Sequence, residues 1–197
     1  TLIPDKNFEQ ALINLGYDAV IDGLVTTKNI NTLSNLDVSN KSIGDLSGIE
    51  DFTSLTTLYC NDNDLNRIDL SSLDSLKDIR CYNNQLTSLI LTKNTALDAL
   101  SCHNNRIQHL DLSVNDALSY LDCHDNNLVS LDVRSSVLNQ LLFYNNPRLR
   151  RVTCINTPLK SIDLTQNSLY LKKFHLHKSH LSLLLLHSQL GLNERQP

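Results

Sequence analysis

Apolar residues recur along the middle of the chain with a period of 21 residues. Each copy follows the pattern L-x-x-L/I-x-C-x-x-N, and the opening leucines are Leu55, Leu76, Leu97 and Leu118. Around the cysteine, apolar and polar residues alternate, which predicts a short strand with one buried face. In the first copy we therefore expect Leu58 and Cys60 to point inward and Thr57, Tyr59 and Asn61 to face solvent.

This repeat predicts a leucine-rich repeat solenoid, mostly β, in which each copy forms one coil and the stacked strands form a parallel sheet. One interior column consists of Cys60, Cys81, Cys102, Cys123, Phe143 and Leu164. A second column lies where the chain turns and consists of Asn63, Asn84, Asn105, Asn126, Asn146 and Asn167. Buried amides there can satisfy backbone groups that the turns leave unpaired, so we interpret these asparagines as structural.

A weaker copy of the pattern begins ten residues after each opening leucine, as in Leu65, Ile68 and Leu70. Both sides of every later coil are therefore expected to be strand-like. This arrangement resembles bacterial leucine-rich repeats whose 21-residue unit consists of two nested halves, common in secreted and surface proteins of the Bacteroidetes. The resemblance covers residues 33–169, about seven coils, and it implies an architecture rather than a ligand.

Residues 1–32 do not repeat, and we expect them to form a short helical cap over the first coil. Asp5 is a suitable N-cap for a helix that Gly16 would end. The apolar stripe of that helix consists of Phe8, Ala11, Leu12 and Leu15. The sequence IPDKNFEQALINLGYD resembles the N-terminal sequence of secreted flavobacterial leucine-rich repeat proteins. In those proteins this sequence follows a cleaved signal peptide. The resemblance implies an exported chain whose mature form begins near Thr1.

Two coils depart from the pattern. The first has 22 residues and carries Lys41 in place of the column asparagine. Its second half resembles the internalin-type repeat, which implies a helical turn near Ile49 to Phe52. The copy that begins at Leu138 starts one residue early. We expect the turn around Asn146 to be one residue longer, so that the second half of this coil returns to the 21-residue register.

Residues 170–197 leave the pattern and place four histidines in a leucine-rich run: His175, His177, His180 and His187. Three interpretations remain open: a C-terminal cap, a poorly ordered segment foreign to the repeats, or a strand that presents H-x-H to a metal. The apolar run is too short and too interrupted to span a membrane.

Cysteine usage and charge narrow the possible functions. Five cysteines without a C-x-x-C pair do not make a disulfide framework, so we predict that all five are free core residues, with Cys154 on the side of the coil opposite the other four. The net charge of −4, without clustered Lys and Arg, excludes a nucleic-acid footprint. Signatures of catalysis or cofactor binding are absent from the sequence, so we expect a non-enzyme without catalytic residues or cofactors.

Function is expected on the exposed strand positions of the middle coils, where tyrosine, histidine and arginine gather as they do at protein interfaces. The predicted binding residues are Tyr59, Arg80, Tyr82, His103, Tyr120, Asp122, His124 and Tyr144. The alternative is structural, because aromatic side chains also fit exposed strands and pair across them. His103 and His124 lack a third ligand, and we assign no metal to them.

These observations favour a non-catalytic binding module for protein–protein interaction or adhesion at a bacterial surface. A carbohydrate-binding module and a structural spacer of a larger surface protein are the alternatives. We expect a monomer, secreted or held at the cell surface.

Overall fold

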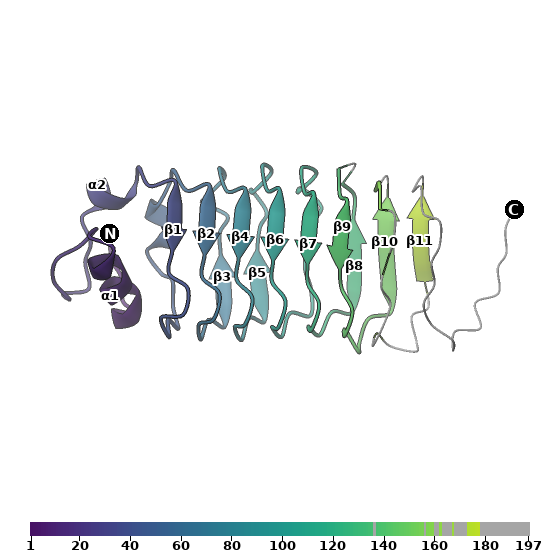
Figure 1. Ribbon diagram of the computed structural model, residues 1–197, viewed down its shortest axis with the longest axis horizontal. Coiled ribbons are helices and arrows are strands. Elements are labelled where there is room, and N and C mark those ends of the chain that lie inside the picture. Colours follow the sequence, from purple (N-terminus) through teal and green to yellow (C-terminus); the bar gives the residue numbers. More distant parts are fainter. Residues whose placement is uncertain (136, 156, 160–161, 163–166, 168–172, 178–197) are drawn as a thin grey trace, which may run out of the picture.

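Short parallel strands stack side by side along the long axis of the computed structural model, and helices lie at its N-terminal end (Figure 1). The structure describes residues 1–135, 137–155, 157–159, 162 and 167, and the backbone of 173–177. The chain is a leucine-rich repeat solenoid, as the 21-residue period predicted.

The main sheet contains one strand from each coil, in the order β1-β2-β4-β6-β7-β9, and every neighbouring pair is parallel. Its strands are β1 (Asn35–Asp37), β2 (Thr57–Tyr59), β4 (Asp78–Arg80), β6 (Ala99–Ser101), β7 (Tyr120–Asp122) and β9 (Gln140–Leu142). These strands correspond to six turns. The predicted seventh coil, with Leu164 in its interior column, lies largely outside the described residues.

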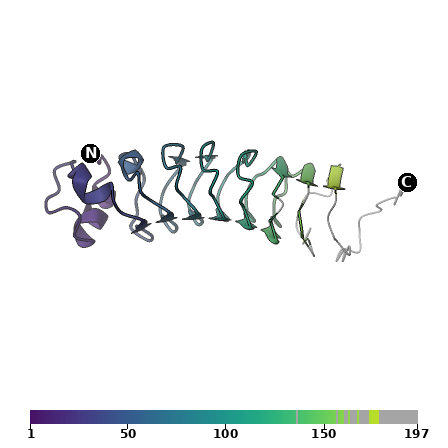
Figure 2. The ribbon, with the colours of Figure 1, turned by 90° about the horizontal axis from the view of Figure 1, so that it is seen from above.

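The second side of the solenoid carries two smaller parallel sheets (Figure 2). The first joins β3 (Arg67–Asp69) to β5 (Ser88–Ile90), and the other has the order β11-β10-β8, with β8 (Ser130–Val133), β10 (Arg151–Ile155) and β11 (Lys173–His177). The expectation of strands on both sides of every later coil was wrong at residues 107–112. Leu110 and Leu112 are buried there, but this fully described stretch forms no strand.

Strand β11 extends the second side beyond residue 169, in the segment that leaves the sequence pattern. Its backbone pairs in parallel with β10, so Arg151 lies opposite Lys173. The rest of residues 170–197 lies outside the described residues. The three interpretations of this segment, as a cap, a poorly ordered tail or a histidine metal site, concern residues and side chains that the structure does not describe.

Alternation within the strands builds the core. The central residue of each main-sheet strand is buried, and these residues are Leu36, Leu58, Ile79, Leu100, Leu121 and Leu141. Paired residues of neighbouring main-sheet strands are 21 positions apart in the sequence for Ala99 and Tyr120, but one position fewer for Tyr120 and Gln140. On the second side, the paired residues Ser130 and Arg151 are again 21 positions apart. The register slip and its recovery near Asn146 are thus confirmed.

The column asparagines join adjacent coils through buried hydrogen bonds. Oδ1 of Asn105 accepts the backbone N–H of Leu86 at 2.9 Å, and its Nδ2 donates to the carbonyls of Cys81 and Cys102 at 3.0 Å each. The same pattern recurs at Asn63, Asn84, Asn126 and Asn146. Their structural interpretation is confirmed for the described coils.

The residue before each column asparagine from Asn63 to Asn146 adopts a left-handed conformation, with φ between 51° and 57°. These residues are Asp62, Asn83, Asn104, Asp125 and Asn145. Asn and Asp tolerate this conformation better than other non-glycine residues, which explains their recurrence. Their side chains also form a ladder, in which Nδ2 of Asn104 donates to Oδ1 of Asn83 at 2.8 Å.

The helices at the N-terminal end are α1 (Lys6–Asn14) and α2 (Thr27–Ile30). Asp5 caps α1 by accepting the N–H groups of Asn7 and Phe8. The ring of Phe8 lies 6.1 Å from that of Phe52, beside the 3-10 turn η1 (Ile49–Asp51) that the first coil was predicted to contain. The helix thereby covers the apolar end of the first coil.

One member of the predicted helical stripe is not in the core. Leu15 is 44% exposed, whereas Phe8, Ala11 and Leu12 are buried. The helix ends at Asn14, so Leu15 lies past the last regular turn and is not held against the first coil. Within the described residues, no helix is long and apolar enough to cross a membrane.

All five cysteines are free and buried, as predicted. Burial raises the pKa of the Cys60 thiol to about 12 and that of Cys102 well above its ordinary value. The thiols are therefore protonated at neutral pH and act as small apolar side chains. Phe143 continues their column and is equally buried, so the interior accepts other apolar groups there.

We expect Cys102→Ser to lower the free energy of unfolding by about 1–3 kcal/mol, because its hydroxyl would lie in an apolar interior. Cys102→Val, which adds no polar group, should be more stable than Cys102→Ser. Thermal melts of the two variants measure this difference. A serine variant that melts above the valine variant would contradict the apolar assignment of this column.

Candidate functional site

The eight predicted binding residues all lie on the exposed face of the main sheet or in the turns that directly follow its strands. The strand residues are Tyr59, Arg80, Tyr120 and Asp122, and the turn residues are Tyr82, His103, His124 and Tyr144. Contacts divide them into two groups. One is centred on Asp122 and the turn residues, and the other on Tyr59.

The four turn residues form a continuous stack of rings, which we call the ring stack. Centroid distances are 4.5 Å for Tyr82–His103, 4.4 Å for His103–His124 and 4.4 Å for His124–Tyr144. The corresponding planes differ by 6°, 10° and 17°. Strands about 4.8 Å apart bring equivalent positions of successive coils within stacking distance, so a repeated ring-bearing position becomes a stack.

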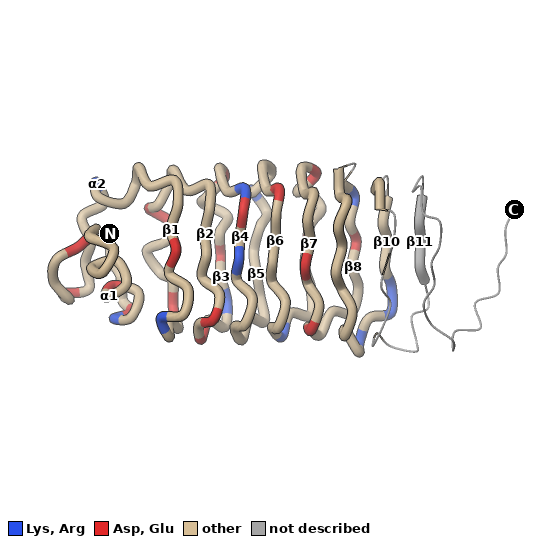
Figure 3. Tube along the Cα trace, viewed as in Figure 1, with Lys and Arg blue, Asp and Glu red and all other residues tan. Residues whose placement is uncertain are grey.

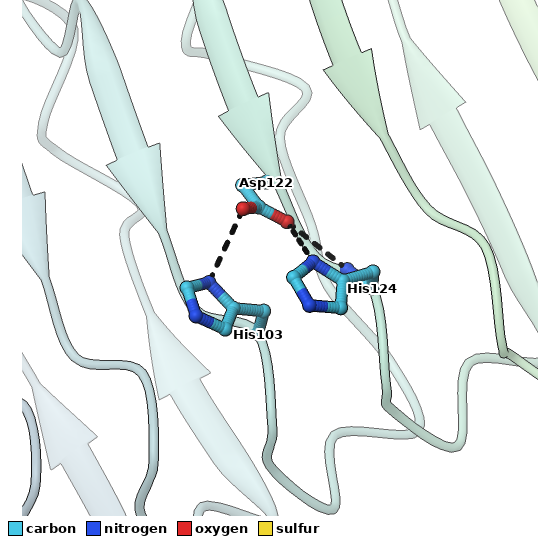
Figure 4. Close-up of side chains that lie close together, drawn as sticks. All are labelled: His103, Asp122 and His124. Carbon is cyan, nitrogen blue, oxygen red and sulfur yellow. Dashed lines mark hydrogen bonds and ion pairs between the residues drawn. The ribbon is translucent and has the colours of Figure 1, made fainter. Parts of the chain in front are cut away.

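Asp122 lies between the two imidazoles of the ring stack (Figure 4). Its Oδ1 is 2.5 Å from Nδ1 of His124, and its Oδ2 is 3.2 Å from Nδ1 of His103. The sequence predicted an exposed residue here, but Asp122 is only 5% exposed. Burial by itself raises the pKa of Asp122, but the hydrogen bonds and charges of the two histidines outweigh this effect and hold the pKa below its usual value.

Two further side chains contact this centre. The Tyr120 hydroxyl donates to Oδ2 of Asp122 at 3.4 Å, and Oδ2 of Asp125 lies 3.4 Å from Nε2 of His124. Sequence reasoning missed Asp125. Its position in the turn, directly after His124, is visible in the sequence, but its contact with the ring depends on side-chain rotamers. His124 therefore faces one carboxylate at each ring nitrogen.

The second group, which we call the Tyr59 cluster, consists of Tyr59, Asp78 and Arg80. The Tyr59 hydroxyl donates to Oδ2 of Asp78 at 2.9 Å, and this bond raises the pKa of Tyr59. The Arg80 guanidinium lies over the Tyr59 ring, with Cζ 4.2 Å from its centroid, and Nη2 is 3.4 Å from Asp78. Asp78 was not among the predicted site residues, although it orients both others.

A shallow depression adjoins the Tyr59 cluster at the N-terminal end of the face. Its lining includes Leu15 and Tyr17 from the cap, Asp37 from β1, and Thr57 and Tyr59 from β2. The exposure of Leu15 therefore contributes an apolar wall to this part of the surface.

Acidic residues occur on β1, β4 and β7 of the exposed face, and Arg80 is a basic residue among them (Figure 3). The acidic residue of β7, Asp122, is buried, so the exposed acidic side chain of this face is that of Asp37 on β1, and Asp78 on β4 is half-buried.

Within the described part of the chain, one group of side chains has donor atoms close enough to hold a metal: His103, Asp122 and His124, whose atoms lie within 4.8 Å of one another. The sequence prediction left the two imidazoles without a third ligand. The structure supplies one in the carboxylate of Asp122.

Comparison with known proteins identifies relatives of the repeat. No protein-family model matches the chain. A 68-residue segment is 35% identical to Internalin J of Listeria monocytogenes serotype 4b (strain F2365), which corresponds to 34% of this chain and 7% of that protein. The chain therefore matches only a small part of this curated relative.

Among solved structures, the functional domain of InlJ from Listeria monocytogenes, described as including a cysteine ladder, matches with a TM-score of 0.68 and 29% identity. The match covers 91% of this chain and 42% of that chain. The leucine-rich repeat domain of APL1B matches with a TM-score of 0.56 and 17% identity, over 88% of this chain and 72% of that one, which shows the fold alone. The repeats of this chain are thus similar in sequence and in fold to those of InlJ.

Proposed function

We propose that the exposed face of the main sheet binds another protein, through a surface formed by the ring stack and the Tyr59 cluster. The observation that carries this proposal is the uninterrupted stack of four rings across four consecutive coils. The stacked rings present a continuous row of ring edges whose side chains are already ordered, so little conformational entropy is lost on binding. Aromatic residues and arginine are also the side chains that most often dominate binding energy.

The similarity to InlJ supports a role as a binding or adhesion module at a bacterial surface. In this proposal residues 33–169 form the binding repeats, residues 1–32 cap their N-terminal end, and the chain acts as a monomer that is secreted or held at the cell surface. The nested repeat and the N-terminal spelling support an origin among the Bacteroidetes. Mass spectrometry of the medium and of surface-labelled cells tests the location.

Carbohydrate binding is the second candidate, because tyrosine rings flanked by Asp, Asn and Arg also suit a sugar. The ring contacts favour a protein instead. Both faces of His103 and His124 are covered by neighbouring rings, and the Arg80 guanidinium covers one face of Tyr59. A sugar that stacks needs an open ring face, whereas a protein side chain can also pack against ring edges. A structural spacer without a ligand is the remaining alternative.

We expect Tyr82→Ala and Tyr144→Ala each to weaken binding of the partner at least about tenfold, because hot-spot aromatic residues contribute roughly 2 kcal/mol or more. The partner is first recovered with the wild-type chain from host or neighbour surface proteins, and affinities are then measured by calorimetry. Ile90→Ala is the matched control, since Ile90 is 38% exposed on β5 of the second side.

A glycan array screened with the same variants distinguishes the candidates. Glycan binding that is lost in both tyrosine variants would replace the protein proposal with the carbohydrate one. Partner binding that the tyrosine variants and Ile90→Ala weaken equally would contradict the assignment of the face. The absence of both protein and glycan ligands would favour the spacer.

A further inference from the structure

We propose that His103, Asp122 and His124 bind one divalent transition-metal ion with the preferences of Zn²⁺. The three donor atoms come from the turns after β6 and β7 and from the end of β7 (Figure 4). They lie within 4.8 Å of one another, so rotation of the two imidazole rings can bring all three onto one ion. This proposal rests on the geometry of the three residues and does not depend on the identity of a protein partner.

The donor set has the chemistry of a zinc site. Two imidazole nitrogens and one carboxylate oxygen are typical three-residue ligands of Zn²⁺, which leave a fourth position open. Asp122 is 5% exposed, so its carboxylate is already largely removed from water before any ion binds. Nδ1 of His103 is buried, and the nearest carboxylate oxygen, Oδ2 of Asp122, lies 3.2 Å from it.

Asp125 provides the outer contact that metal-binding histidines usually have. Its Oδ2 lies 3.4 Å from Nε2 of His124, the ring nitrogen that points away from Asp122. A carboxylate there favours a proton on Nε2 and leaves Nδ1 as the metal ligand. Nδ1 of His124 can thus bind the ion, while Nε2 is held by its contact with Asp125.

Metal binding must disturb the ring stack. The His103 and His124 rings are 4.4 Å apart and within 10° of parallel, so the lone pairs of their Nδ1 atoms do not converge. An ion is bound in the plane of each imidazole, and the two rings must therefore tilt toward each other. Tyr82 and Tyr144 pack on the outer sides of these rings, so their environment must change with them.

The experiment titrates Zn²⁺ into the full chain by calorimetry and follows tyrosine fluorescence, which is unobscured because the chain contains no Trp. To remove any contribution of the tail histidines, every variant is made in a background that carries His175→Gln, His177→Gln, His180→Gln and His187→Gln. His109→Gln is the matched control, because His109 is an exposed histidine of the repeats outside the proposed site.

We expect one Zn²⁺ per chain in this background, together with a change in tyrosine fluorescence. Asp122→Asn and His124→Gln should each weaken binding at least tenfold, and Asp125→Asn about tenfold, the usual effect of losing an outer contact. His109→Gln should bind as the background does. Thermal melts without metal establish that each variant is folded.

Loss of stoichiometric binding in the background chain would overturn the proposal and assign the metal to the tail. Equal affinity of the background, Asp122→Asn and His124→Gln would overturn it as well. Partner binding measured with a chelator present tests the proposed function separately, since the ring stack is intact without metal.

Discussion

Replacement of Phe8 by alanine is expected to lower the free energy of unfolding by about 3–5 kcal/mol, the usual cost of removing a fully buried aromatic side chain. Phe8 is 0% exposed, and its ring stacks on Phe52 of the first coil. The substitution leaves a cavity where the cap covers the open end of the solenoid. Because repeats contact only their neighbours, we expect the first coil to lose protection before the later coils.

Urea denaturation followed by circular dichroism measures the total effect, and hydrogen exchange locates it. Leu15→Ala is the matched control, since Leu15 follows the same helix but is 44% exposed. It should change stability by no more than about 0.5 kcal/mol. If exchange accelerated equally in all coils of Phe8→Ala, the chain would unfold as one cooperative unit and the cap would not protect the first coil selectively.

The solenoid could be predicted because its determinants are local and repeated. Leu58 and Cys60 alternate with polar neighbours, and copies of the same pattern recur every 21 residues. Each copy therefore predicts the same strand, the same turn and the same buried position independently of the others. The shortened spacing before Gln140 was also visible, because both columns shift by one residue together.

Element ends and isolated strands were harder to predict, because they depend on contacts between segments. Leu15 fits the apolar stripe of α1, but the helix ends one residue earlier. Leu110 is buried as its position requires, and yet no strand forms around it. Buried side chains alone do not determine whether two backbones hydrogen bond, so the apolar pattern could not distinguish this coil from its neighbours.

The candidate site was predictable as a set of columns but not as a set of contacts. The period placed His103 and His124 side by side on successive coils. That Asp122 would point between them, and that Asp125 would reach the far nitrogen of His124, depends on rotamers selected across coils. For this reason the sequence indicated a surface of aromatic residues, while the buried carboxylate at its centre required the structure.

Replacement of Asn105 by alanine should lower the free energy of unfolding by about 3 kcal/mol, since each buried polar group left unpaired costs roughly 1–3 kcal/mol. The side chain accepts the N–H of Leu86 and donates to the carbonyls of Cys81 and Cys102. Those backbone groups belong to three segments in two adjacent coils. One substitution therefore removes hydrogen bonds within a turn and also hydrogen bonds that connect the two coils.

Asn66→Ala is the control for the loss of an amide, because Asn66 is exposed on the second side of the solenoid. Its effect should stay within about 0.5 kcal/mol. Urea titrations of both variants give the comparison, and hydrogen exchange at the Leu86 amide reports directly on the lost bond. A Leu86 amide that stayed as protected in Asn105→Ala as in the wild type would mean that water replaces the side chain, and the column asparagines would then add little to the stability of the stack.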